Sequence, residues 1–396
     1  MDEHEKEMYR RILNWFKGKK EMPFKIDVEL HRRCNLRCLS CSRRASPDYE
    51  NLNEISKKIE MPTEKWIQIV KEASELRVRE WHIAGGGEPM FLPERTIRVM
   101  KEIKKHEMLG IITTNGTLWS NKIIEETVKM GWDRVHFSID APIEKVHDYL
   151  RGKKGTFKKV VLTLKKFNKA KKKFKSEKPM LNINFVLSNK NYKLLPKMVE
   201  FAKKFNISFL FVDPLIVYSE LGEKLKMKKE EIRDFLPYLE KARKLAEKFN
   251  ISNNFSGIQN NLSNELIEKT SRMDEVVREE VERVKTLKLN NFLKKFLLIP
   301  CYKPWFHVTI KCDGRTTSCD VPIFGGDDVK NKSLKEIWFG EYFENLRKTF
   351  LCGKIPDFCK QCNASHTSQR RMARLEIIRM LEPSFFEEAK KIYGVV

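Results

Sequence analysis

The stretch HRRCNLRCLSC, residues 31–41, follows a strand-like run at residues 24–30 and carries the most specific pattern in the chain. Its three cysteines, Cys34, Cys38 and Cys41, have the spacing C-x3-C-x2-C. A four-iron cluster is usually held by four thiolates, so three thiolates would leave one iron with an open position for a small chelating ligand. The spacing therefore predicts an iron–sulfur cluster that takes part in chemistry as well as in electron storage.

Zinc is the competing interpretation of this segment. A structural zinc ion takes four ligands, usually from two Cys-x2-Cys pairs or from a mixture of Cys and His. Only one such pair is present, although His31 could complete a tetrahedron with the three thiolates. The segment alone leaves both metals open.

A glycine run follows the next strand-like segment. Residues 81–84 lead into Gly85-Gly86-Gly87-Glu88-Pro89. Because glycine has no side chain, a ligand could touch this backbone, and the carboxylate of Glu88 could take a ligand ammonium group. The alternative is a flexible turn between a strand and a helix.

Strand-like runs alternate with amphipathic segments from residue 24 to about residue 214, which predicts a parallel sheet. The expected strands are 25–30, 79–84, 109–114, 134–139, 181–187 and 207–213. The expected helices are 64–76, 94–105, 122–130, 157–171 and 195–205. Six such units predict an α/β fold and are too few for a full eight-stranded barrel; the family resemblance described below implies a partial (β/α)6 TIM-like barrel. Ligands bind parallel barrels at the carboxyl ends of the strands, where Asn184, Asn191 and Asp213 are expected to face the ligand, or to serve as turn and cap residues.

Together these features resemble the radical S-adenosylmethionine superfamily over about half of the chain. The resemblance implies that the open iron binds the amino and carboxylate groups of S-adenosylmethionine, whose reductive cleavage gives a 5′-deoxyadenosyl radical. Glycines and Glu88 would contact the amino group, while a strand-end serine and a later arginine would hold the carboxylate. The expected cofactor contacts are Gly86, Gly87, Glu88, Asn115, Ser138, Arg151 and Asn184. The alternatives are that Ser138 caps the following helix and that Arg151 is a solvated surface charge.

A second group of cysteines lies near the C-terminus. Cys301 precedes an alternating run, Asp313-Gly314 is typical of a hairpin turn, and Cys319 follows a short return strand. After a helical pattern at 333–338 come Cys359 and Cys362. Taken alone, these four cysteines could also form a zinc ribbon. Their order on a hairpin-plus-helix frame resembles the twitch module, the short form of the SPASM domain, which implies one auxiliary four-iron cluster.

Two further cysteines are left over. Cys312 lies at the hairpin and Cys352 lies seven residues before the last pair. Their simplest interpretation is that they are small buried hydrophobic residues, although either could replace a ligand or face the substrate. With four ligands the auxiliary cluster is closed and serves electron transfer, whereas with three it could bind substrate directly.

These patterns predict four regions. Residues 1–23 would form a basic amphipathic helix, in which Ile12, Trp15 and Phe16 pack against the barrel. Residues 24–219 would form the barrel, and 220–300 a helical linker with helices at 224–249 and 264–284 and an Asn/Ser-rich loop at 250–264. Residues 301–396 would form the twitch/SPASM-like domain.

The amino-acid composition indicates a cellular compartment and possible binding partners. Nine cysteines in 396 residues, most of them in metal-type spacings, indicate a reducing compartment, so we expect a cytoplasmic location. We expect no transmembrane segment or signal peptide. The formal charge of +24 would attract a polyanion such as RNA, a phosphorylated metabolite or a membrane surface. Solvated lysine faces of a thermophile-like composition explain the same charge, and no standard nucleic-acid-binding pattern is evident.

The sequence therefore predicts an enzyme that cleaves S-adenosylmethionine reductively and abstracts a substrate hydrogen atom. It would be an oxidoreductase or would form C–C or C–S bonds, with two four-iron clusters and a ferredoxin- or flavodoxin-like electron donor. The substrate would be a small molecule or a peptide, either of which could be anionic. The alternatives are a zinc-stabilised basic RNA-binding protein on a degenerate barrel and an iron–sulfur electron carrier.

Overall fold

The computed structural model describes residues 2–262, 282, 284–286, 289–319, 326–362 and 364–393. Its centre is one twisted sheet with the strand order β7-β6-β5-β4-β3-β2-β1-β8-β9, in which every neighbouring pair is parallel except β8 and β9. The six expected strands are confirmed and lie side by side in chain order. Their bounds are β1 (Lys25–Val28), β2 (Glu80–Ile83), β3 (Leu109–Thr114), β4 (Arg134–Ser138), β5 (Met180–Leu187) and β6 (Phe209–Pro214).

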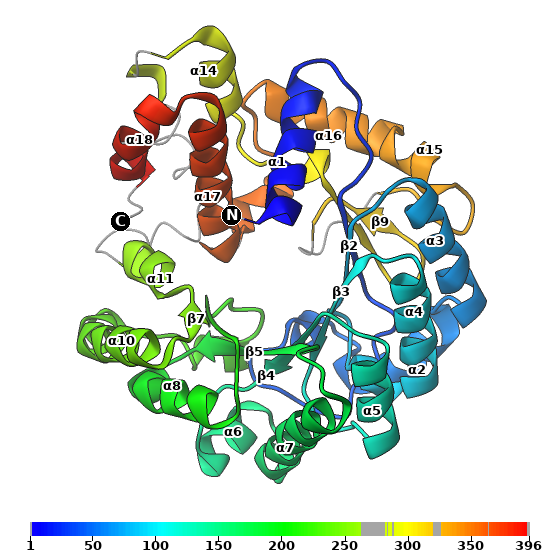
Figure 1. Ribbon diagram of the computed structural model, residues 1–396, viewed down its shortest axis with the longest axis vertical. Coiled ribbons are helices and arrows are strands. Elements are labelled where there is room, and N and C mark those ends of the chain that lie inside the picture. Colours follow the sequence, from blue (N-terminus) through cyan, green and yellow to red (C-terminus); the bar gives the residue numbers. More distant parts are fainter. Residues whose placement is uncertain are drawn as a thin grey trace.

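Helices cover the outer face of these strands, as in a partial barrel (Figure 1). The five expected helices are confirmed, and two short helices, α2 and α6, come in addition. Buried tryptophans, among them Trp66, Trp81 and Trp132, fill the space between helices and sheet. The helices are α2 (Leu52–Ile59), α3 (Thr63–Glu75), α4 (Pro93–Lys105), α5 (Asn121–Lys129), α6 (Glu144–Leu150), α7 (Thr156–Phe174) and α8 (Leu195–Lys204).

The sheet extends beyond the six strands at both edges. At one edge β7 (Ser252–Asn253) pairs with β6, followed by α11 (Phe255–Leu262). The prediction of a loop at 250–264 is therefore wrong for residues 252–253 and 255–262. The side chain of Asn254 both accepts from the Val212 amide and donates to the Val212 carbonyl, at 2.9 Å each, so it continues the strand pairing. Upstream lie α9 (Glu220–Glu223) and α10 (Lys229–Phe249), whereas the helix expected at 264–284 lies almost entirely outside the described residues.

At the other edge the C-terminal hairpin joins the barrel sheet. β8 (His307–Ile310) pairs in parallel with β1, and β9 (Thr316–Thr317) returns antiparallel to it. Gly314 has φ +94° in the turn, which confirms the hairpin at Asp313-Gly314. The remaining elements are α14 (Asn291–Leu297), α15 (Leu334–Trp338), α16 (Glu341–Leu351), α17 (Ala364–Leu381) and α18 (Phe386–Tyr393), with short 3-10 turns at Lys303–Trp305 and Asp357–Gln361.

The N-terminal helix differs from its prediction. α1 spans Glu3–Phe16, so residues 17–23 are not helical, and Asp2 caps its first turn. Ile12 is fully buried, but it belongs to a hydrophobic cluster whose other members, outside α1, all come from residues 284–389. Phe16 likewise contacts the rings of Phe296 and Trp305 at 4.9 and 5.3 Å. The helix therefore packs mainly on the C-terminal part of the chain and not on the barrel alone.

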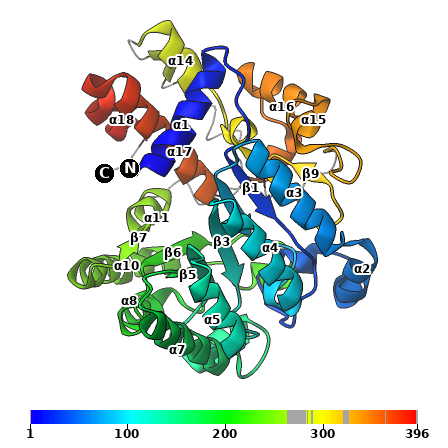
Figure 2. The same cartoon turned by 45° about the vertical axis from the view of Figure 1, so that its right-hand side comes forward.

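α17 lies between the N-terminal helix and the β6 edge of the barrel. It contacts α1, α11 and β6, and Figures 1 and 2 show it beside α1 in both views. The open side of the partial barrel is thus faced by a C-terminal helix. None of the described helices combines the length and apolar character that a membrane crossing needs.

Candidate functional site

The three N-terminal cysteines lie on a loop after β1 whose backbone is held by neighbouring side chains. Asn53 of α2 accepts a hydrogen bond from the Cys34 amide at 3.0 Å and donates to the Cys34 carbonyl at 3.2 Å. Arg44 donates to the Cys38 carbonyl oxygen at 2.7 Å. These bonds give the cysteine loop, residues 34–41, a defined shape.

The thiols of this loop are buried beside a cation. Burial raises the pKa of the Cys34 thiol to about 12 and also raises the pKa of Cys38. Arg151 opposes this effect at Cys38, because its Nη1 lies 3.9 Å from the Sγ atom. Metal ligation requires thiolates, so cluster binding here must release protons. Thiols next to a guanidinium, here Cys38 and Cys41 beside Arg151, suit an anionic iron–sulfur cluster.

The zinc alternative that used His31 is inconsistent with the geometry. Nδ1 of His31 accepts a hydrogen bond from the Arg33 amide at 3.2 Å, and Nε2 faces the Pro89 carbonyl oxygen at 3.4 Å. Burial lowers the pKa of His31 to about 4, so the ring is neutral, and Nε2 carries the proton that the carbonyl accepts. The only ring nitrogen with a free lone pair is Nδ1, and this atom already accepts the hydrogen bond from the Arg33 amide. His31 therefore has no lone pair left for a zinc ion.

The glycine run packs against the start of the cysteine loop. A Cβ atom on Gly86 would lie 2.6 Å from the His31 carbonyl oxygen, and one on Gly87 would overlap the Arg33 carbonyl. The Glu88 amide donates to that same Arg33 oxygen at 2.9 Å. These glycines are therefore required by contact with the protein's own backbone. Their role as cofactor contacts stays a prediction.

The Glu88 carboxylate joins the ends of two strands. It accepts hydrogen bonds from Thr114 Oγ1 and the Asn115 amide at 2.6 Å each, and from the Met90 amide at 3.1 Å. Burial raises its pKa. A carboxylate has about four acceptor positions, so a cofactor ammonium group would be its fourth donor.

Asn115 connects the end of β3 to the cysteine loop. Its Nδ2 donates to Asn35 Oδ1 at 3.0 Å, while its Oδ1 accepts from the Thr117 amide at 2.9 Å. Asn35, directly after Cys34, was not singled out from the sequence, and that position is the signal that points to it. The side chain of Asn115 thus already holds the loop, and its predicted cofactor contact remains untested.

Only 11% of the Arg151 side chain is exposed, so its interpretation as a solvated surface charge is wrong. Its Nη2 lies 2.9 Å from Asp140 Oδ2, and its Nε is buried without a hydrogen-bond partner. Asp140, which follows β4, is the acidic partner that the sequence did not reveal. The helix-cap alternative for Ser138 is also wrong, because Ile143 occupies the N-cap position of α6.

The ends of β5 and β6 differ in their polar groups. The Oδ1 atom of Asn184 is buried without a hydrogen-bond partner. Asn191 is a turn residue, since its Nδ2 donates to the carbonyl oxygens of Asp140 and Val186 at 2.8 Å each. Burial raises the pKa of Asp213 to about 6. Arg151 thus leaves one donor and Asn184 one acceptor without a protein partner, and their role as cofactor contacts stays a prediction.

A cavity of about 960 Å³ extends from the strand ends to the C-terminal cysteines. Its wall includes Ser40 of the cysteine loop, Asn184 and Asp213. All four C-terminal cysteines also lie on this wall, namely Cys301, Cys319, Cys359 and Cys362. The cavity thus reaches the cysteine loop at Ser40 and the four C-terminal cysteines directly.

The four C-terminal thiols influence one another. Burial raises the pKa of Cys359, and the charges of the other three cysteines raise it further. Burial likewise raises the pKa of Cys362 to about 12, with added effects from Cys301 and Cys319. Among the described residues, no three His, Cys, Asp or Glu side chains converge as tightly as a single metal ion requires. Four thiols within electrostatic reach of one another match the four-thiolate donor set of an iron–sulfur cluster.

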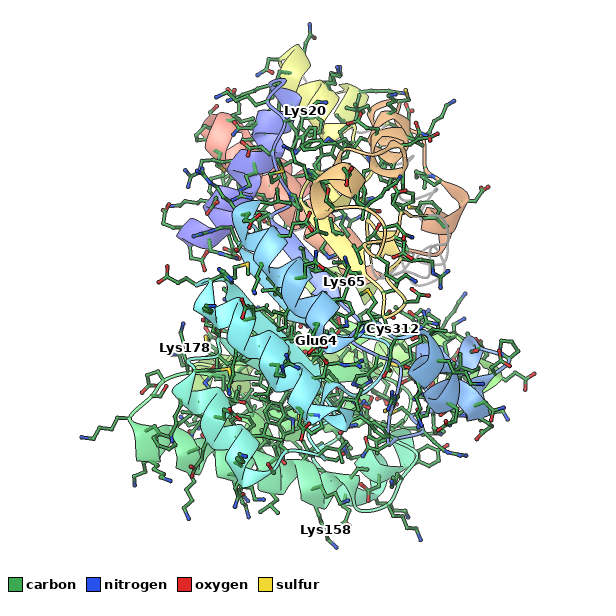
Figure 3. All side chains as sticks on the ribbon, turned by 90° about the vertical axis from the view of Figure 1, so that its right-hand side faces the viewer. Lys20, Glu64, Lys65, Lys158, Lys178 and Cys312 are labelled. Atoms are coloured by element: carbon green, nitrogen blue, oxygen red, sulfur yellow. The ribbon has the colours of Figure 1, made fainter. Side chains whose placement is uncertain are left out.

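The two remaining cysteines lie apart from this group. Cys312 is fully buried, its charged neighbours are Arg32, Glu29, Asp313 and Glu60, and Figure 3 shows it beside the α3 end that carries Glu64 and Lys65. Cys352 is exposed at the C-terminal end of α16. The interpretation as a small buried residue therefore fits Cys312 and is wrong for Cys352. All nine cysteines are free thiols.

Comparisons with known proteins agree with this arrangement. Residues 28–202 match the family model of the radical SAM superfamily, and residues 301–363 match that of the SPASM iron–sulfur cluster-binding domain. A cofactor-modifying protein for the tungsten-containing aldehyde ferredoxin oxidoreductase of Pyrococcus furiosus is 24% identical over 83% of this chain and 85% of its own length. A PqqA peptide cyclase of Granulibacter bethesdensis is 32% identical, but over only 46% of this chain and 45% of its own.

A solved structure shares the fold over most of the chain. The structure of SuiB from Streptococcus suis bound to its precursor peptide SuiA has a TM-score of 0.60 at 17% identity, covering 85% of this chain and 70% of SuiB. Residues 28–202 thus form a radical SAM domain, and residues 301–363 form a SPASM-type domain. The cofactors of the chain are accordingly a [4Fe-4S] cluster with S-adenosylmethionine in the barrel and iron–sulfur in the C-terminal domain.

Proposed function

We propose that this protein cleaves S-adenosylmethionine reductively and removes a hydrogen atom from a substrate held between its two cysteine groups. The observation that carries the proposal is the cavity of about 960 Å³, whose wall includes Ser40 of the cysteine loop and all four C-terminal cysteines. A substrate in this space lies next to both centres.

In this proposal Cys34, Cys38 and Cys41 hold the barrel cluster. Bound together, that cluster and S-adenosylmethionine supply a carbon-centred radical able to attack an unactivated C–H bond. Arg151, which pairs with Asp140, lies 3.9 Å from the Cys38 Sγ atom and offers its free Nε to the cofactor carboxylate. Apolar side chains on the cavity wall, including Ile111, Val186 and Phe211, keep water away from the reacting carbon.

The auxiliary centre is assigned to Cys301, Cys319, Cys359 and Cys362. Four thiolates complete the coordination of a four-iron cluster, so no iron is left for substrate. Such a closed centre suits electron transfer, which favours a net two-electron oxidation of the substrate over a bond-forming reaction. Asp213, with a pKa near 6 on the same cavity wall, is placed to take up the proton that this oxidation releases.

The preferred substrate is a small molecule. The relative that aligns over both domains is a cofactor-modifying protein, and the cavity wall offers both basic and acidic groups to a polar substrate, such as Arg134 and Lys303 beside Glu80 and Asp213. A peptide is the second candidate, because the structural likeness includes SuiB with its precursor peptide. Nucleic acid is not favoured, because the sequence carries no standard nucleic-acid-binding pattern; Figure 3 shows the side chains on one face of the molecule.

Extracts of the source cells grown in heavy water provide a test that does not require the substrate to be known. The reconstituted protein, dithionite and S-adenosylmethionine are incubated with the small-molecule fraction or the peptide fraction. Deuterium in 5′-deoxyadenosine marks the fraction that contains the substrate, and we expect it in the small-molecule fraction. Deuterium from the peptide fraction supports the second candidate. Zinc in place of iron, or no 5′-deoxyadenosine with either fraction, would contradict the proposed function.

A further inference from the structure

Helix α17 begins after the matched SPASM region, yet it holds the segment that carries Cys301. Nη1 of Arg370 donates to the Pro300 carbonyl oxygen at 3.0 Å, and Nη2 of Arg374 donates to the Ile299 carbonyl oxygen at 2.8 Å. Both arginines are buried, with 4% and 0% of their surface exposed. Since residues four apart lie on one face of a helix, this face of α17 fixes the two residues directly before Cys301.

Arg370 also acts on a second cysteine of the group. Its guanidinium lies close enough to Cys362 to interact with it electrostatically, and Lys303 brings a second positive charge to the same place. Arg370 and Lys303 lie on the same cavity wall as the four cysteines. One buried guanidinium therefore reaches ligands from both ends of the proposed set, Cys301 through its backbone and Cys362 through its charge.

A buried cation affects an iron–sulfur centre in a definite direction. Each electron that the centre accepts adds one negative charge, and charges interact strongly where water is excluded. A nearby guanidinium therefore stabilises the reduced form more than the oxidised form and raises the reduction potential, as net charge and hydrogen bonding do in such centres generally.

We propose that Arg370 is a positioning residue of the auxiliary iron–sulfur centre, which fixes the Cys301 segment and raises the reduction potential of the centre. The proposal rests on the proposed function, because it requires the four-cysteine cluster to form. On this proposal α17 controls the properties of the auxiliary centre, although the helix contributes no ligand to it. An easily reduced centre is what an electron acceptor beside the substrate needs.

The test is a redox titration followed by electron paramagnetic resonance. The full chain with Cys34, Cys38 and Cys41 replaced by Ala retains only the auxiliary centre, so its signal is not overlapped. In this background R370Q removes the charge, and R370K keeps it. We expect R370Q to lower the ratio of reduced to oxidised centre at least tenfold at a given potential, a shift of about 59 mV for one electron, while R370K stays near the parent value.

R379Q is the matched control. Arg379 lies on the same helix but nine residues further on, about 13 Å along the axis, and its half-exposed side chain pairs with Glu376 at 3.0 Å. The same chemical change there should leave the potential unchanged. A shift in R379Q equal to that in R370Q would overturn the proposal.

The outcomes separate this inference from the proposed function. If the parent variant binds no iron, the four-cysteine centre itself is wrong. If R370Q binds iron with the parent potential, the centre stands and the role of Arg370 is refuted. If R370Q loses its iron, the R370K variant decides. An R370K variant that binds iron with the parent potential supports the proposal. An R370K variant that binds iron with a lowered potential overturns it.

Discussion

Replacing Arg151 by Gln should destabilise the protein markedly, because Arg151 neutralises a buried carboxylate. The pair of Arg151 and Asp140 is 2.9 Å apart, and only 11% and 4% of the two side chains are exposed. Removing one partner of a buried pair costs about 3–5 kcal/mol, since the other charge remains without compensation. The exposed pair of Arg37 and Glu50, with side chains 66% and 64% exposed, is the matched control. R37Q should cost less than about 1 kcal/mol.

The loss in R151Q should also depend on pH. Burial raises the pKa of Asp140, and Arg151 holds that rise down. Without Arg151 the folded-state pKa rises further above the unfolded value. The stability of R151Q is then fully present below the pKa of Asp140 in the unfolded chain, and it is lost as pH rises through the pKa of Asp140 in the folded protein. The deficit of R151Q should therefore be larger at pH 8 than at pH 5.

Urea unfolding of the anaerobic, reduced full chain at both pH values measures these differences. The double variant D140N/R151Q removes the uncompensated charge and should regain part of the stability lost at pH 8. A loss in R151Q no larger than that in R37Q would refute the assignment of a buried pair. So would an equal loss at both pH values combined with no recovery in the double variant.

Three further predictions concern the cavity and the cysteines. Because burial raises the pKa of Asp213 to about 6, D213N should be more stable than the wild type by about 2–3 kcal/mol at pH 8. Urea unfolding should show that this difference vanishes below about pH 4. Equal stability of the two proteins at pH 8 would contradict the prediction. Replacing the four C-terminal cysteines by Ala should remove about half of the iron, as expected for two four-thiolate-type clusters, and unchanged iron would refute that ligand set. C312A and C352A should keep their iron, and a loss equal to that of the quadruple variant would assign those thiols as ligands.

The local elements of the fold were predictable from the sequence, because they depend on local pattern. The six strands, the five helices between them and the turn at Asp313-Gly314 follow from apolar periodicity and turn chemistry. The pairing of β8 with β1 was not predictable in this way. The two strands lie 282 residues apart in the register pair Lys25 and His307, and nothing in either strand's own sequence specifies the other.

The prediction of a loop beside β6 was wrong because it relied on amino-acid composition. An Asn-rich segment is typical of a loop, yet Asn254 uses its side-chain amide to pair with the backbone of Val212. An amide side chain carries the same donor and acceptor as a peptide group, so it can continue a sheet. The sequence alone does not distinguish these two uses of asparagine.

The cysteines of the candidate site were predictable, and most of their supporting residues were not. Spacing singled out Cys34, Cys38 and Cys41 because their ligands are close in sequence. Asp140 and Arg370 support cysteines that lie far from them in the chain, so only the three-dimensional arrangement reveals them. Glu88 was singled out as a ligand contact, but the structure shows that its carboxylate also ties β2 to β3.

The central claim is that the cysteine loop supports reductive cleavage of S-adenosylmethionine. The most direct measurement is 5′-deoxyadenosine formed by the anaerobically reconstituted protein with dithionite, compared with the variant in which Cys34, Cys38 and Cys41 are all Ala. We predict formation by the wild type and by C312A, and none by the triple variant, although that variant keeps its C-terminal iron. Cleavage by the triple variant at the wild-type rate would contradict the account.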